Sequence, residues 1–254
     1  MPVFPTLFPG TIWQTNVVVI ATIFLTGLIV FVLLRLAVVR MDMRHPRGLQ
    51  NLVEWAFDFS ESMAKDVMPS EESRRFVRPL AFIMLLFLFV ANWLGLIMTI
   101  TVHFDPHAHV WGLSPSDLQS AKGDVELFDS PTSNMSMALG LAILVWLISH
   151  ARGLRHPIKW FRHLLRHPPF GLLEEITNPL THGMRLFGNI FAGEILLGLL
   201  LRAPFAFHFI PWQLPFIIAW LLYSGFVATI QAYVFSILMC LYIGMKSFEA
   251  DSQH

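Results

Sequence analysis

Charged residues are scarce in this sequence. Of its 254 residues, 17 are Lys or Arg and 17 are Asp or Glu, or 13% of the chain, whereas soluble domains average ~25%. Hydrophobic residues make up 55%. So few charges cannot cover a soluble fold of this length, and the composition predicts a protein that crosses a lipid bilayer several times. The formal net charge is zero, without the basic excess of nucleic-acid-binding proteins, so we expect no nucleic-acid partner.

Motifs that carry common enzyme chemistry are also absent. The single cysteine, Cys240, excludes an intrachain disulfide and any zinc site built on paired cysteines. The chain has no P-loop, HExxH, GxSxG or GxGxxG motif, which mark common nucleotide, metal and hydrolase sites. We therefore expect no catalytic activity in the chain alone, no cofactor and no metal. The first 16 residues contain no Lys or Arg, so we expect no cleavable signal peptide.

Five apolar stretches are present instead. Four are long enough to cross ~30 Å of hydrocarbon, and the third is marginal in length. The stretches cover about residues 13–39, 76–101, 134–149, 172–201 and 211–243. The segments between the first four are predicted as loops, with bounds 40–75, 102–133 and 150–171. We expect residues 1–254 to form a single membrane domain.

The last two apolar stretches are longer than a membrane requires. Thirty helical residues rise ~45 Å and thirty-three rise ~50 Å, well beyond the hydrocarbon thickness. Only the segment RAPFAFHFIP lies between the two stretches, so they form a hairpin. Because tilting is the usual way to absorb such a mismatch, we expect an all-α integral membrane protein that ends in a long, inclined hairpin.

Lys and Arg residues are divided unevenly among the loops. Residues 35–78 hold eight and residues 150–168 hold five, whereas residues 102–133 hold only Lys122 alongside five acids. If successive loops alternate sides, fourteen basic residues lie on one side and two on the other. Positively charged loops stay on the cytoplasmic side. The loop of residues 102–133 is therefore predicted outside, the other two loops inside, the N-terminus outside and the C-terminus inside.

One basic residue, Arg185, lies inside the fourth apolar stretch. A charge near the bilayer centre costs at least ~2.5–3.5 kcal/mol, and an arginine does not lose its proton. One interpretation is a structural ion pair that holds two helices together. On a helix, however, Glu194 would lie on the opposite face ~13.5 Å along the axis, and Glu174 would lie ~16 Å away. Neither acid neutralises Arg185 within its own helix.

Carboxylates therefore flank a permanent cation along one helix. Glu174 and Glu175 lie toward the predicted inner end, and Glu194 lies toward the outer end. Ionisable residues within a membrane span mark ion and proton paths, and this order is typical of two half-paths that a cation separates. We expect at least one of Glu174 and Glu175 to line the inner half-path. The alternative is that both acids cap the helix N-terminus, where the helix dipole favours them.

Small and polar residues accompany this cation. Gly188, Ala192 and Gly193 follow it and let another helix approach closely, although packing within the chain is an equally good interpretation of the spacing. In the fifth stretch, Ser224 and Gln231 are seven residues apart and share a helix face. Isolated hydroxyls in helices often bond backbone carbonyls, so Gln231 is the favoured functional residue of this stretch.

The segment RLFGNIFAGEILLGLL, residues 185–200, resembles the signature of subunit a of the F-type (rotary) ATP synthase. The segments ANWLGL around Asn92, PTSNMS from Pro131 and IQAYVFSILMCLYIG from Ile230 are also similar to that family. The resemblance covers essentially the whole chain and is strongest to bacterial members, especially Gram-positive ones. It implies five to six helices, the last two packing against a ring of c subunits in the bacterial inner (cytoplasmic) membrane. The implied partners are the c-ring, the b subunits of the peripheral stalk and the remaining subunits of the ATP synthase.

The resemblance also implies roles for residues. Arg185 matches the family's essential arginine, which separates two offset half-channels and couples proton flow to ATP synthesis. Asn189 and Glu194 match residues of the outer half-channel, and Gln231 matches a glutamine that faces the arginine. Ser224 stands where some members have histidine, so the outer path here is expected to rely on water and Glu194. The residues expected to pack against the c-ring are Gly188, Ala192 and Gly193.

Other departures and alternatives remain open. Many family members have Lys or Arg where this chain has Asn178, and many have Asp where it has Asn134.

A self-contained secondary transporter or channel, with Arg185 binding an anionic substrate, is the alternative function, although it predicts an internal repeat or broken helices that the sequence lacks. The coupling ion (H⁺ or Na⁺), the ring stoichiometry and the preferred direction are left open. Three histidines lie in the predicted outer loop. We interpret them as solvated loop residues in preference to metal ligands: His103, His107 and His109.

Overall fold

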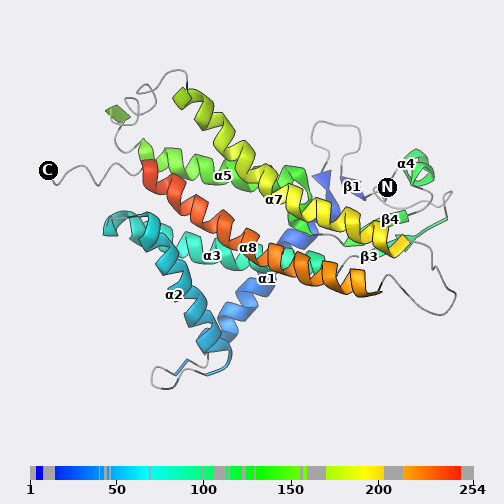
Figure 1. The fold of residues 1–254 in the computed structure, drawn as a ribbon, viewed down its shortest axis with the longest axis horizontal. Coiled ribbons are helices and arrows are strands. Elements are labelled where there is room, and N and C mark those ends of the chain that lie inside the picture. Colours follow the sequence, from blue (N-terminus) through cyan, green and yellow to red (C-terminus); the bar gives the residue numbers. More distant parts are fainter. Residues whose placement is uncertain are drawn as a thin grey trace.

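Long helices dominate the fold (Figure 1). The computed structural model describes residues 4–7, 15–39, 41–42, 45, 47–68, 70–98, 100–105, 113, 115–121, 124–128, 130–154, 157–158, 170–202 and 214–246. The helices are α1 (Val17–Val39), α2 (Leu49–Val67), α3 (Glu71–Ile97), α4 (Pro115–Ser120), α5 (Met135–Gly153), α7 (Phe170–Arg202) and α8 (Leu214–Lys246). The short strands are β1 (Thr6–Leu7), β2 (Thr15–Asn16), β3 (Ile100–His103) and β4 (Asp124–Phe128). Strand β1 pairs antiparallel with β2, and β3 pairs antiparallel with β4.

Five of these helices are long and apolar enough to cross a membrane. They are α1, α3, α5, the Glu175–Leu200 part of α7, and α8. The predicted all-α membrane fold is thereby confirmed. Many of their large apolar side chains are exposed in the isolated chain, including Phe24 and Phe31 of α1, as expected for helices that face lipid or partner proteins.

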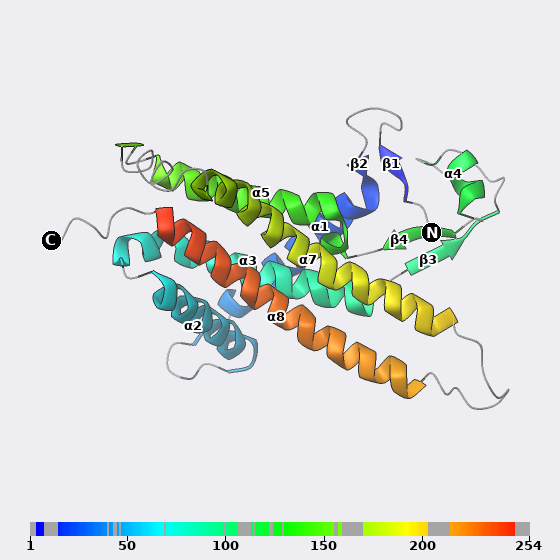
Figure 2. The ribbon, with the colours of Figure 1, turned by 45° about the horizontal axis from the view of Figure 1, so that its top comes forward.

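Helix α8 lies at the centre of the bundle. It packs against α3, α5 and α7, and α7 runs beside it in the opposite direction (Figures 1 and 2). The C-terminal ends of α5 and α8 and the N-terminal end of α7 gather at one end of the molecule, whereas β3, β4 and α4 lie at the other (Figure 2). The buried core that joins these helices includes Val77, Leu88, Val145, Leu186, Phe235, Met239 and Ile243.

Several helix ends differ from the sequence prediction, because polar residues extend or form helices. Helix α2 lies inside the predicted loop 40–75, since its apolar residues recur on one face while its charged residues occupy the other. Helix α3 begins at Glu71, before the apolar stretch, where the Ser70 hydroxyl accepts a hydrogen bond from the Ser73 amide (3.5 Å). The predicted loop 102–133 contains β4, α4 and half of β3.

Helix α5 begins at a capping asparagine. The Asn134 side chain accepts hydrogen bonds from the amides of Ser136 (3.0 Å) and Met137 (3.4 Å), and this satisfies backbone donors that a helix start leaves open. The helix continues to Gly153, four residues beyond the predicted end. Asn134 therefore has a structural role at the position where many family members have aspartate.

Candidate functional site

A mainly apolar cavity that several polar side chains enter lies among α3, α7 and α8, toward the end of the molecule that carries β3 and β4. Its volume is about 150 Å³, which is space for several water molecules. Apolar residues such as Leu197 and Val227 form part of its wall. The polar side chains that line it are Asn92, Asn189, Glu194, Tyr223, Ser224 and Gln231.

The cavity brings together four of the predicted polar site residues. Asn189 and Glu194 come from α7, and Ser224 and Gln231 come from one face of α8. The Asn189 side-chain amide donates a hydrogen bond to Gln231 Oε1 (2.8 Å), and Gln231 is 3% exposed. Glu194 and Ser224 lie nearer the hairpin tip on α7 and α8. The hydrogen bond therefore joins the two helices at the end of the cavity that is farther from the tip.

Ser224 presents a hydroxyl to this space. Its Oγ atom is buried, and the described part of the chain gives it no hydrogen-bond partner. The backbone of α7 approaches closely here, since a Cβ on Gly193 would lie 3.9 Å from that Oγ. The Trp220 indole closes the wall nearby by donating a hydrogen bond to the Gly193 carbonyl (3.1 Å). A buried hydroxyl beside other polar groups in a cavity of this size is suited to binding water.

Asn92 of α3 is a cavity residue to which the sequence prediction gave no role. Its side-chain nitrogen donates to the Ala228 carbonyl (3.1 Å), and its Oδ1 accepts from the Thr132 hydroxyl (2.9 Å). The Ser130 hydroxyl lies 2.7 Å from the Thr132 hydroxyl. This buried network ties the segment before α5 to α3 and α8. The similarity of the ANWLGL and PTSNMS segments to one family was the only sequence signal for it.

Arg185 lies outside the cavity. Its side chain is exposed on α7, and no described side chain forms an ion pair or hydrogen bond with its guanidinium. Glu194 lines the cavity instead, in keeping with the opposite-face placement deduced from the nine-residue spacing. Within the described chain, the cation at the middle of α7 therefore has no carboxylate of its own.

A second charged cluster joins the ends of three helices far from the cavity. Lys246 of α8 donates a hydrogen bond to Glu175 of α7, and the His150 Nε2 atom of α5 lies 3.2 Å from Glu175 Oε2. Lys246 Nζ is also 2.9 Å from His150 Nε2. The first turn of α7 contains no acid, so the interpretation of Glu175 as a helix cap is wrong. The Glu174 side chain lies outside the described residues.

The three small residues of α7 have different surroundings. Gly188 has open space where a Cβ would stand, whereas Ala192 and Gly193 line the cavity. On α7, the close approach to another helix occurs at Gly183, where a Cβ would lie 2.8 Å from Leu139 Cδ2 and 3.0 Å from Leu139 Cα of α5. Gly183 precedes the arginine and is not among the predicted packing residues, which all follow it.

The histidines of the predicted outer loop do not form a metal site in the part of the chain that is described. His103 is exposed on β3, and His107 and His109 lie outside the described residues. No group of three or more His, Cys, Asp or Glu side chains suited to a metal occurs among the described residues.

Comparison with known proteins places the chain in one family. Residues 20–244 match the family model described as ATP synthase A chain. The chain is 34% identical over 239 residues to ATP synthase subunit a of Staphylococcus carnosus, covering 91% of this chain and 90% of that protein. It is 36% identical over 234 residues to the Limosilactobacillus fermentum subunit, covering 87% and 90%, and 32% identical over 246 residues to the Enterococcus faecalis subunit, covering 93% and 94%. The chain therefore belongs to the ATP synthase A chain family.

Proposed function

We propose that this chain conducts protons to a rotating ring of c subunits through two offset half-channels that Arg185 keeps apart. Membership of the ATP synthase A chain family makes the chain a non-catalytic, proton-translocating membrane subunit of a bacterial rotary ATP synthase. The proposal adds the route, the residues that form it and the partner that moves. The family match over residues 20–244 disfavours the alternative of a self-contained transporter.

The observation that carries the proposal is the exposed, unpaired guanidinium of Arg185 in the middle of an apolar helix. A cation that costs several kcal/mol in hydrocarbon requires a counter-charge, and the described chain supplies none to it. A carboxylate on a passing c subunit would supply one. At ~4 Å and an effective dielectric constant of ~20, their attraction is ~4 kcal/mol, which favours the ionised carboxylate about 1000-fold. The ring carboxylate would therefore release its proton beside Arg185 and regain one after it moves past.

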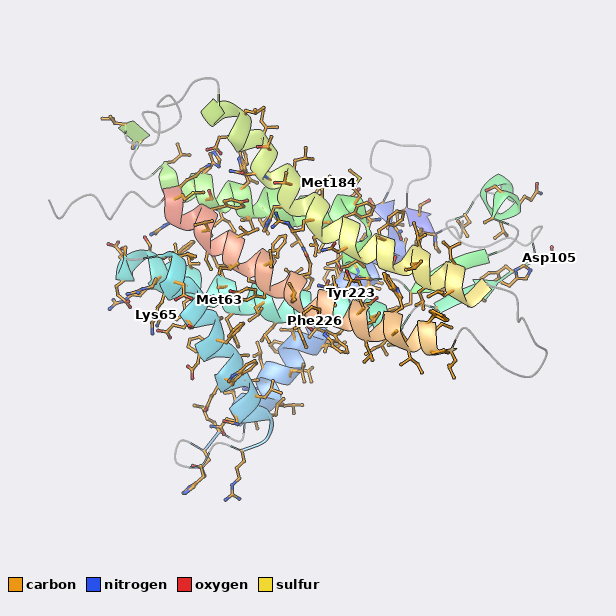
Figure 3. The ribbon with its side chains drawn as sticks, in the orientation of Figure 1. Met63, Lys65, Asp105, Met184, Tyr223 and Phe226 are labelled. Atoms are coloured by element: carbon orange, nitrogen blue, oxygen red, sulfur yellow. The ribbon has the colours of Figure 1, made fainter. Side chains whose placement is uncertain are left out.

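The exposed face around Arg185 suits a helical partner. Arg185, Gly188 and Ala192 recur at helical spacing on one side of α7, and Gly188 leaves open space on that side. Large apolar side chains of the same hairpin are also exposed: Met184 by 41%, Tyr223 by 56% and Phe226 by 64%; Figure 3 labels all three near the middle of α7 and α8. We therefore assign this face to the c-ring, while the b subunits and the other ATP synthase subunits contact the chain elsewhere.

The cavity is suited to the outer half-channel. Glu194 supplies an ionisable group, and the Ser224 hydroxyl and the cavity volume are suited to ordered water. Protons would pass along these groups from the hairpin tip toward the middle of α7. The Asn189–Gln231 hydrogen bond closes the inner end of the cavity near Arg185. The scarcity of basic residues in the loop of residues 102–133 supports an outward orientation of this end, with the C-terminus inside.

The inner half-channel is assigned to the opposite end of α7, near Glu174 and Glu175. Glu175 is held by Lys246 and His150, so other titratable groups surround this carboxylate, which supports the assignment. Protons released beside Arg185 would leave through this region. The membrane potential then supplies ~2.3 kcal/mol per charge per 100 mV to drive the cycle.

Replacing Arg185 by alanine tests the separation of the two half-channels. The Arg185→Ala variant should assemble with the other subunits, lose coupled ATP synthesis, and allow passive proton flow through the membrane sector, because the electrostatic barrier is removed. Proton flux driven by a potassium diffusion potential in vesicles, with the ATPase sector stripped off, measures the passive flow. Coupled synthesis at the wild-type rate would refute the proposal.

A further inference from the structure

His182 is a buried titratable residue that the proposed pathway does not use. It lies on α7 one turn before Arg185, and its side chain is 2% exposed. Its ring lies against the Phe235 ring, tilted by 33° at a centroid separation of 3.8 Å, and meets Tyr242 edge-on at 5.6 Å. Its Nε2 atom is fully buried, and nothing in the described part of the chain forms a hydrogen bond with it.

A buried polar atom without a hydrogen-bond partner, such as His182 Nε2, destabilises the folded protein. Native proteins satisfy most such atoms, and an exception points to a function or to a partner that is present only part of the time. The surroundings of His182 on α8 are aromatic, so leucine or phenylalanine would fill the same space without that penalty. The imidazole must therefore offer something that an apolar side chain lacks.

Arg185 is the group best placed to be that partner. Residues three apart are neighbours on a helix surface, and helical side chains lean toward the N-terminus, so Arg185 leans over the turn that holds His182. A guanidinium carries five donors and no acceptor, whereas neutral histidine has one ring nitrogen that accepts. Arg185 has no hydrogen-bond partner among the described residues, and Glu175, the next described acid toward the helix start, is held by Lys246.

We propose that His182 is a positioning residue whose neutral Nε2 accepts a hydrogen bond from the Arg185 guanidinium in the interval between successive ring carboxylates. The inference rests on the proposed function of Arg185. In that interval the guanidinium has no counter-charge, and the hydrogen bond to His182 holds it at the α7–α8 interface. The next carboxylate then draws it back to the exposed face. His182 itself neither gains nor loses a proton in this cycle.

Two substitutions at position 182 separate this role from packing. In the reconstituted, fully assembled ATP synthase, His182→Leu removes the acceptor but fills the apolar site, whereas His182→Gln keeps an acceptor oxygen on a side chain of similar reach. Losing one charge-assisted hydrogen bond changes an equilibrium constant about tenfold or more. The rate of ATP-driven proton pumping should therefore fall about tenfold in His182→Leu. In His182→Gln it should stay within about twofold of the wild-type rate. Subunit stoichiometry of the purified complex is the control for assembly.

Two other results of the pumping assay would overturn the inference. Wild-type pumping by His182→Leu would show that the residue only fills space. An equal loss in His182→Leu and His182→Gln would show that the imidazole carries a proton itself. If His182→Leu does not assemble, ¹⁵N NMR of the labelled wild-type complex decides: an unprotonated, hydrogen-bonded Nε2 supports the inference, and a protonated Nε2 refutes it.

Arg185→Ala, measured in parallel, separates this inference from the proposed function. Wild-type pumping by Arg185→Ala refutes the proposed function and the inference together. Loss of coupled pumping in Arg185→Ala with normal pumping in His182→Leu refutes only the inference about His182.

Discussion

Arg185 and Glu194 lie nine residues apart on α7 and meet different surroundings. Arg185 stands on an exposed face with no partner among the described residues, whereas Glu194 lines the cavity with Ser224 and Gln231. We propose that a partner from outside the chain completes the first environment, and that the second holds water and exchanges protons. Two charged residues of one helix can thus serve separate steps of one path.

Replacing Glu194 by glutamine keeps the size and hydrogen-bonding capacity of the side chain but removes its titration. If Glu194 passes protons through the outer half-channel, Glu194→Gln should slow proton-driven ATP synthesis about tenfold or more, within the range typical of general acid–base groups, with assembly intact. Synthesis in vesicles energised by an imposed pH gradient measures the effect. Glu72→Gln is the matched control, because Glu72 is exposed in the first turn of α3, away from the cavity. Wild-type rates in Glu194→Gln would remove Glu194 from the path.

The helix-to-helix contacts are set by small residues and by hydrogen bonds between distant segments. Gly183 brings α7 against the backbone of α5, and the Asn189–Gln231 hydrogen bond fastens α7 to α8. At the opposite end, Lys246 and His150 hold Glu175. These contacts fix the spacing of the helices around the cavity and leave the Arg185 face free for another protein.

Gly183→Ala tests the close packing of α5 and α7. The new Cβ would lie 2.8 Å from Leu139 Cδ2 and 3.0 Å from its Cα, so the helices must separate, at a cost of about 1–3 kcal/mol as in other overpacked sites. The thermal transition of the purified complex should fall. Gly140→Ala is the control, because the space at Gly140 of α5 is open. Equal transitions for the two variants would contradict the packing described here.

The sequence predicted the apolar helices and the hairpin well, because hydrophobic length is a local property. Helix α2 was predicted as part of a loop, because its amphipathic sequence contains many polar residues and lies between two longer apolar stretches. The sequence indicated the cavity residues Asn189 and Gln231, but their hydrogen bond spans 42 positions and follows only from helix packing. The Glu175–Lys246 contact spans 71 positions, so no local pattern revealed it. His182 was missed because burial of its Nε2 depends on α8.

At the scale of the whole molecule, we propose that the fold serves as a stationary wall beside the rotating ring. Helix α8 packs against α3, α5 and α7 (Figure 1), while α7 and α8 line most of the cavity and α7 carries Arg185. We expect the wall to keep its shape while a neighbouring ring turns against it. The proposed coupling depends on one property, a permanent positive charge at position 185.

Arg185→Lys measures that property most directly, because lysine keeps the charge but loses its proton when desolvated and lacks the planar five-donor group. The measurement is proton-driven ATP synthesis by the reconstituted complex, with subunit stoichiometry as the control for assembly. If Arg185 must remain charged while ring carboxylates exchange protons beside it, the Lys variant assembles and coupled synthesis is abolished. Robust coupled synthesis by Arg185→Lys would contradict the account.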